Sequence, residues 1–180
     1  GDGLPDFIGG MTNSFRYKNW DLQALAIFSV GAKIFDSSAK RQLGVVSSWN
    51  MRTDKFDRWR QPGDVAEFPI LTLDETKYGL DEGFPWWNTS LFVYDASYLR
   101  LRNLALGYTF QNLKVKNMTF NNLRLAVNVT NLFTLTNFPG LDPEVARDFE
   151  NAQDRNLSPN VTYLTPPQER SYNFTLSFAF

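Results

Sequence analysis

The strongest constraint on this chain is the strict alternation of residue types across residues 170–180. A period of two predicts a β-strand with one apolar face and one polar face. A strand of this kind, about ten residues long, is the repeating unit of outer-membrane β-barrels, although the final strand of a soluble sandwich would show the same pattern. The apolar positions are Tyr172, Phe174, Leu176, Phe178 and Phe180.

The same alternation recurs earlier in the chain. Between residues 97 and 110 the apolar positions change parity near Arg102, which indicates a β-bulge or a strand that rises above the lipid. Residues 1–10 are expected to form a loop, and residues 111–121 a connection of moderate length. The alternation predicts strands near residues 11–18, 21–30, 97–110, 122–134 and 170–180.

The connections between these strands are alternately short and long. The long ones, 31–96 and 135–169, show no sustained period. Barrels have this connectivity, with short periplasmic turns and long extracellular loops. Five strands cannot close a barrel, because about eight is the minimum. We therefore expect an all-β, antiparallel transmembrane segment, the C-terminal part of a larger barrel, whose last strand runs toward the periplasm.

Composition excludes several function classes. The chain has no Cys and no His, which removes thiolate chemistry, disulfides and the commonest general base and metal ligand. A net charge of −1 provides no basic field for nucleic acid. Paired carboxylates remain formally able to hydrolyse glycosides, but no local context supports them. We expect no enzyme activity and no catalytic residue.

Several ordered segments resemble SusC/RagA-type TonB-dependent transporters. They follow one another in the family's order and span nearly the whole chain. Each alone would be weak, and their order makes the resemblance specific. The segments are Phe7–Gly10, Asn13–Leu22, Ala96–Tyr108, Asn131–Thr136, Gly140–Val145 and Pro166–Pro167.

The resemblance implies a barrel of roughly 22 strands with a plugged lumen, crossing the outer membrane of a Bacteroidetes-type bacterium many times. Such transporters import oligosaccharides or peptides. Their partners are a SusD-like surface lipoprotein, which lids the mouth, and the TonB complex of the inner membrane. The resemblance places this chain at the C-terminal end of the barrel, in contact with lipid, and we expect the plug domain to lie outside it.

The first long loop holds the tryptophans that we predict to contact ligand or the lid lipoprotein. Flat aromatic rings stack on sugars and are enriched at protein interfaces. The plainer interpretation is that these rings hold the loop together. The candidates are Trp49, Trp59, Trp86 and Trp87.

A second group of polar residues lies within the predicted strands. A charge on the lipid face costs about 2–4 kcal/mol at the midplane, so these side chains are expected to face the lumen, the plug or water. Lining a polar interior is a commoner role for them than binding an anionic ligand. The residues are Arg100, Arg102, Arg124, Asn128 and Asn173.

The end of the last strand, Leu176, Phe178 and Phe180, resembles the signal by which the barrel-assembly machinery accepts its substrates. An alternative role is in the periplasmic aromatic girdle. We expect no cofactor; acidic pairs in the long loops are able to bind Ca²⁺, but none has the spacing of a dedicated calcium loop.

One function from a different class stays open at this stage. A secreted carbohydrate-binding β-sandwich could also use loop tryptophans. Folding in plain buffer would favour the sandwich, whereas dependence on detergent would favour the barrel segment.

Overall fold

The computed structural model describes residues 1–42, 50–53, 57–73, 89–116, 118–144, 160–163 and 165–179. The chain forms two compact units. We call them the sheet unit and the loop unit, and describe each by itself. The sheet unit comprises Pro5–Gly31, Ser97–Asn137 and Pro167–Phe180, and the loop unit comprises Gly1–Leu4, Ala32–Ala96 and Phe138–Pro166.

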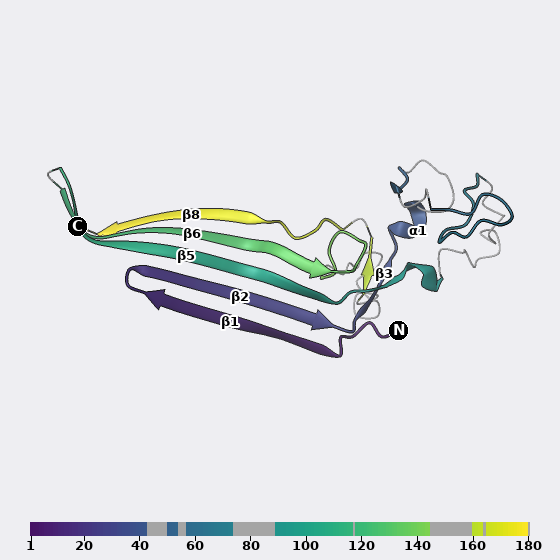
Figure 1. Ribbon diagram of the computed structural model, residues 1–180, viewed down its shortest axis with the longest axis horizontal. Helices are drawn as coiled ribbons and strands as arrows, with labels where there is room; N and C mark the ends of the chain where they lie inside the picture. Colours follow the sequence, from purple (N-terminus) through teal and green to yellow (C-terminus); the bar gives the residue numbers. More distant parts are fainter. Residues whose placement is uncertain are drawn as a thin grey trace, which may run out of the picture. The chain divides into compact units, whose positions relative to one another are not determined.

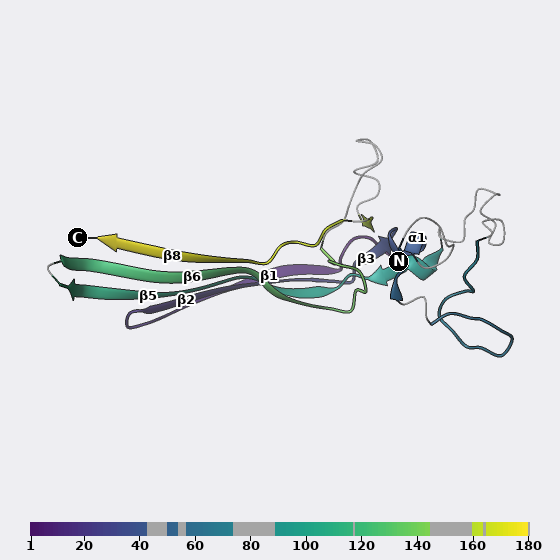
Figure 2. The same cartoon turned by 90° about the horizontal axis from the view of Figure 1, so that it is seen from above.

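The sheet unit is one antiparallel sheet of five long strands, in the order β1-β2-β5-β6-β8. Strand β8 (yellow) lies along β6, and β1 (purple) lies along β2, at the two edges (Figures 1 and 2). The predicted all-β antiparallel fold is confirmed, and the sheet is not closed into a barrel. The strands are β1 (Phe7–Tyr17), β2 (Trp20–Val30), β5 (Tyr98–Val115), β6 (Met118–Thr136) and β8 (Ser171–Ala179).

The start of β1 differs from the sequence expectation. Strand β1 begins at Phe7 rather than near residue 11, inside the stretch predicted to be a loop. Its Gly9 interrupts the apolar alternation, because the ring of Phe28 on β2 occupies the space of a side chain there: an added Cβ would lie 2.7 Å from the ring. A strand glycine under an aromatic ring of the neighbouring strand is a known packing solution.

The predicted connection at 111–121 is wrong. Strands β5 and β6 continue pairing to Val115 and Met118, which leaves only a two-residue link between them. Asn112 has a positive φ of 52° and is passed over in the pairing register. The pairing resumes in the same register at Leu113 and Phe120, so the strand continues past the point where the alternation of the sequence is interrupted.

The parity change near Arg102 is a β-bulge. On β5, Leu101 pairs with Ala26 and Asn103 pairs with Leu25, so Arg102 has no opposite residue on β2. The extra residue returns the apolar side chains on both sides of the bulge to the same face of the sheet. Of the two explanations offered by the sequence, the bulge is therefore confirmed.

The apolar face of the sheet is open along β8. Phe174 is 83% exposed, and Tyr172 and Leu176 are each more than half exposed. A β-sandwich buries such a face against a second sheet, so these exposures argue against the sandwich alternative. An uncovered apolar face of this extent marks an interaction surface. No helix among the described residues is long and apolar enough to cross a membrane.

The loop unit contains short elements that periodicity did not reveal. Strands of two to four residues are too short to establish a period, so both long segments looked irregular in the sequence. A second sheet has the order β4-β3-β7, with β3 antiparallel to β4 and parallel to β7. The elements are β3 (Lys33–Asp36), α1 (Ala39–Gln42), the 3₁₀-helix η5 (Ser90–Phe92), β4 (Val93–Asp95) and β7 (Val161–Thr162).

Strand pairing and packing join the two long loops into this unit. The amide of Phe35 donates to the carbonyl of Asn160 at 2.9 Å, and the amide of Ser37 donates to that of Thr162 at 2.8 Å. One small core contains Phe138 from the second loop, packed with Ile34 and other residues from the first. A separate core contains Ala39, Phe68 and Phe92, and the remaining members of the first core are Ala32, Ala96 and Tyr94.

Candidate functional site

The polar face of the sheet unit carries an ion pair that spans three strands. Arg124 on β6 reaches across β5 to Asp21 on β2, and its Nη2 lies 2.7 Å from Asp21 Oδ2; Nη1 contacts Oδ1. The guanidinium lies over Gly107, where an added Cβ would come within 2.5 Å of Cζ. Only glycine leaves room for this crossing. The two side chains are 37% and 31% exposed, so the pair is partly hydrated.

Asn128 and Asn173 form a polar row between β6 and β8. They are direct register partners, and each alternates with apolar neighbours along its strand. They therefore share the face of Arg124, which is separated from Asn128 by an even number of residues. The structure thus places Arg124, Asn128 and Asn173 on one polar face, and their position in a lumen stays a prediction.

Arg100 and Arg102 differ in their surroundings. Arg100 lies between Leu99 and Leu101 on β5, hence on the polar face, where it is only 2% exposed and its guanidinium carbon is 5.6 Å from the ring centroid of Tyr98. Arg102 lies in the bulge, and its Nη1 donates to Asn131 at 3.3 Å and to Gln168. Arg102 is thus engaged in holding the bulge to the segment that precedes β8.

Asn131 completes this bulge cluster. It has a positive φ of 52°, its side-chain nitrogen donates to the carbonyl of Glu169 at 2.9 Å, and its own carbonyl accepts from Arg170 Nε at 3.2 Å. Asparagine adopts this left-handed conformation more readily than most residues. The bulge cluster fixes where β8 meets β6.

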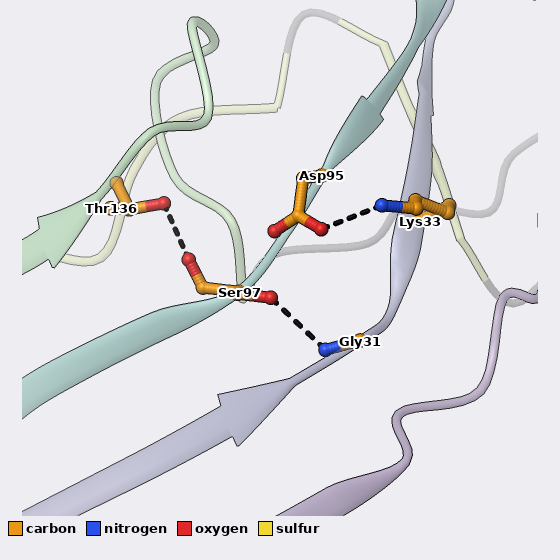
Figure 3. Close-up of polar contacts among 5 residues, drawn as sticks. All are labelled: Gly31, Lys33, Asp95, Ser97 and Thr136. Carbon is orange, nitrogen blue, oxygen red and sulfur yellow. Dashed lines mark hydrogen bonds and ion pairs between the residues drawn. The ribbon is translucent and has the colours of Figure 1, made fainter.

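A second polar cluster lies where the long strands end. Ser97 Oγ accepts from the amide of Gly31 at 3.0 Å, and the carbonyl of Ser97 accepts from Thr136 Oγ1 at 2.8 Å (Figure 3). Gly31 has a φ of +96°, and an added Cβ would lie 2.1 Å from Asp6 Oδ2. The sequence analysis did not single out these residues. The available signal was Gly31, which directly follows the alternating run that forms β2.

Within the loop unit, Figure 3 also shows an ion pair between β3 and β4. Lys33 Nζ lies 2.6 Å from Asp95 Oδ2, and both side chains are more than a third exposed. Exposed pairs of this type contribute about 0–1 kcal/mol. The contact therefore adds little stability to the pairing of these two strands.

Of the four candidate tryptophans, Trp59 lies within the described part of the chain, and Trp49, Trp86 and Trp87 lie outside it. Trp59 is 37% exposed, and its amide donates to the carbonyl of Phe68 at 2.8 Å. Phe68 is a core residue, only 4% exposed, so it anchors the backbone beside Trp59. A partly exposed indole on an anchored backbone suits contact with a ligand or protein, and that role stays a prediction.

The predicted assembly signal lies on edge strand β8. Leu176 and Phe178 are 58% and 55% exposed, and the ring of Phe178 meets that of Phe120 at a centroid distance of 6.0 Å. Phe180 lies outside the described residues. An exposed edge with aromatic side chains is chemically suited to strand addition.

Comparisons with known proteins decide the family. No family model matches the chain. Over 180 residues, all of this chain, it is 31% identical to TonB-dependent receptor P3 of Formosa agariphila. It is also 28% identical, over 78% of its length, to TonB-dependent receptor SusC of Bacteroides thetaiotaomicron. The chain is part of a SusC/RagA-like TonB-dependent receptor. It spans 17% of the length of P3 and 13% of the length of SusC.

Solved structures support the same fold for this receptor segment. The RagAB peptide importer in its open-open state matches 98% of the chain with a TM-score of 0.71 at 21% identity. Its closed-closed state matches with a TM-score of 0.68. The segment covers 17% of each solved chain. The five-stranded sheet therefore has the fold of a section of barrel wall, as in the RagAB structures.

The relatives bear on chemistry as well. They are receptors, which confirms the prediction that this SusC/RagA-like segment is not an enzyme. Within the ranges that the structure describes, no group of three or more acidic, His or Cys side chains is arranged to hold a metal ion. The predicted capacity of the acidic loops for Ca²⁺ stays a prediction.

Proposed function

We propose that this chain forms part of the wall and outer loops of a receptor that imports a nutrient across the outer membrane. The observation that carries the proposal is that the sheet has two different faces. One face is apolar and exposed, and the other is polar and carries the Arg124–Asp21 ion pair and the row of Asn128 and Asn173. Lipid would cover the first face, and the second would line a water-filled or plugged interior.

The connections of the sheet support this orientation. At one end β1 joins β2, and β5 joins β6, through two-residue links. At the other end the chain leaves the sheet for the loop unit. Short turns on the periplasmic side and long loops outside are the arrangement of outer-membrane barrels. The role of this segment would be structural support and surface recognition rather than chemistry.

The partners follow from the family. A SusD-like lipoprotein would close over the loops, and the TonB complex would act on a plug domain outside this chain. The cargo would be an oligosaccharide or a peptide; RagAB is described as a peptide importer, and its open-open and closed-closed states suit gated entry.

The test uses the full-length receptor and its gene. We expect the purified protein to remain monodisperse only in detergent and to migrate on gels with heat-modifiable mobility. Deleting the gene should abolish uptake of one glycan or peptide, and deleting TonB should have the same effect. A receptor that is folded and monodisperse in plain buffer, or whose uptake persists without TonB, would contradict the proposal.

A further inference from the structure

The loop unit contains a pocket that none of the predicted sites includes. It encloses about 290 Å³ and is lined by both long loops. We call it the seam pocket. This volume is at the lower end of the range for small-molecule sites, so the pocket fits one small chemical unit rather than a long ligand. Its polar lining comes from Asp36, Ser38, Gln42, Arg52, Thr162 and Thr165.

The charged residues of the seam pocket neutralise each other. Asp36 is 2% exposed, and its Oδ1 accepts from the amides of Ser38 and Ala39, both at 3.0 Å. Its Oδ2 lies 3.3 Å from Arg52 Nη1. A buried carboxylate held in this way is already satisfied, and among the described residues of the lining no other is charged. The described lining therefore carries no excess charge with which to select an anionic or cationic ligand.

The remaining polar residues have hydroxyl or amide side chains. Ser38, Thr162 and Thr165 have hydroxyl groups that both donate and accept, and the amide of Gln42 does the same with separate atoms. Pro139 and Leu141 supply an apolar wall beside them. Sugar rings have the matching chemistry, with hydroxyl groups around the rim and C–H groups on the faces. An extended peptide instead needs a groove or a strand edge along its length.

We infer that the seam pocket binds one ring of a neutral saccharide. The inference rests on the proposed import function, because it assigns a surface contact to the same receptor. Since β3 and β7 supply lining residues from different loops, a bound ring would contact both loops at once.

The experiment uses the full-length receptor in detergent. The probes are maltotriose, cellotriose, laminaritriose and mannotriose, with trigalacturonate and trialanine as the acidic and peptide alternatives. Saturation-transfer NMR identifies the probe that binds, and calorimetry gives its Kd. The test variant is Gln42→Ala with Thr162→Val, which removes polar side-chain groups and leaves the Asp36–Arg52 pair in place.

The matched control is Gln61→Ala with Thr53→Val, because both residues are exposed, belong to the loop unit and lie outside the pocket lining. We expect one neutral trisaccharide to bind, with at least a tenfold higher Kd in the test variant and an unchanged Kd in the control. Heat-modifiable mobility must be retained by both variants. Heat-modifiable mobility distinguishes failure of this inference from failure of the proposed import function, because the import function fails if the wild-type receptor is not a barrel.

Three results would overturn the inference while leaving the import function intact. The first is the absence of saturation transfer to every neutral trisaccharide. The second is a bound trisaccharide whose Kd is the same in the test variant and the control. The third is binding of trigalacturonate or trialanine that is lost in the test variant, since the pocket would then take a different ligand class.

Discussion

Glycine at position 107 makes the ion pair between Arg124 and Asp21 sterically feasible. The guanidinium of Arg124 occupies the space above this residue on its way to Asp21. We predict that Gly107→Ala destabilises the receptor by about 1 kcal/mol, because the methyl group displaces a partly hydrated ion pair. The measurement is the denaturant midpoint of the heat-modifiable form.

A double-mutant cycle separates this effect from a general intolerance of side chains. In an Arg124→Ala background the same Gly107→Ala change should cost nothing or stabilise slightly, because alanine suits a strand better than glycine does. Equal costs in both backgrounds would show that the glycine is required for another reason.

Gly31 and Gly63 form a matched pair of positions that separates the effect of backbone strain from the effect of a steric clash. Both have positive φ angles, 96° and 99°, but an added Cβ at Gly31 meets Asp6 whereas the space around Gly63 is open. We predict that Gly31→Ala costs about 2–3 kcal/mol and Gly63→Ala about 1 kcal/mol, both measured as a shift in unfolding midpoint. A larger cost at Gly63 would contradict the steric argument.

At the scale of elements, the bulge cluster positions the last strand. Asn131 combines a left-handed backbone with a side-chain bond to the segment before β8. We predict the stability order wild type, then Asn131→Gly, then Asn131→Ala. Glycine loses only side-chain bonds worth about 1 kcal/mol, whereas alanine adds a backbone penalty of about 1–2 kcal/mol. Thermal midpoints of the heat-modifiable band measure the order, and an alanine variant as stable as the glycine variant would refute it.

The strands also show which parts of the fold the alternation of residue types can predict. Alternation located all five long strands, because each keeps an apolar face over many residues. It misplaced the start of β1 and the end of β5, where Gly9 and Asn112 interrupt the pattern for packing and backbone reasons. It could not find β3, β4 and β7, whose pairing depends on contacts between distant segments. The seam pocket and the Arg124–Asp21 crossing were hidden for the same reason.

At the scale of the molecule, the two long loops share one sheet and one small core. Residues of the first loop donate backbone hydrogen bonds to the second, and Phe138 of the second loop packs in the core beside Ile34 of the first. A core of this size depends on each large side chain. The loops should therefore lose order together rather than separately.

Truncation of Phe138 tests this cooperation. The side chain is 6% exposed, and we predict that Phe138→Ala costs the loop unit about 3–5 kcal/mol. Hydrogen exchange should then accelerate at the amides of Phe35 and Ser37 in the first loop, while amides of the sheet unit keep their protection. Leu141→Ala is the control, because Leu141 is 74% exposed in the same segment. Faster exchange confined to residues 138–166 would mean that the two loops are independent bodies, each able to open alone.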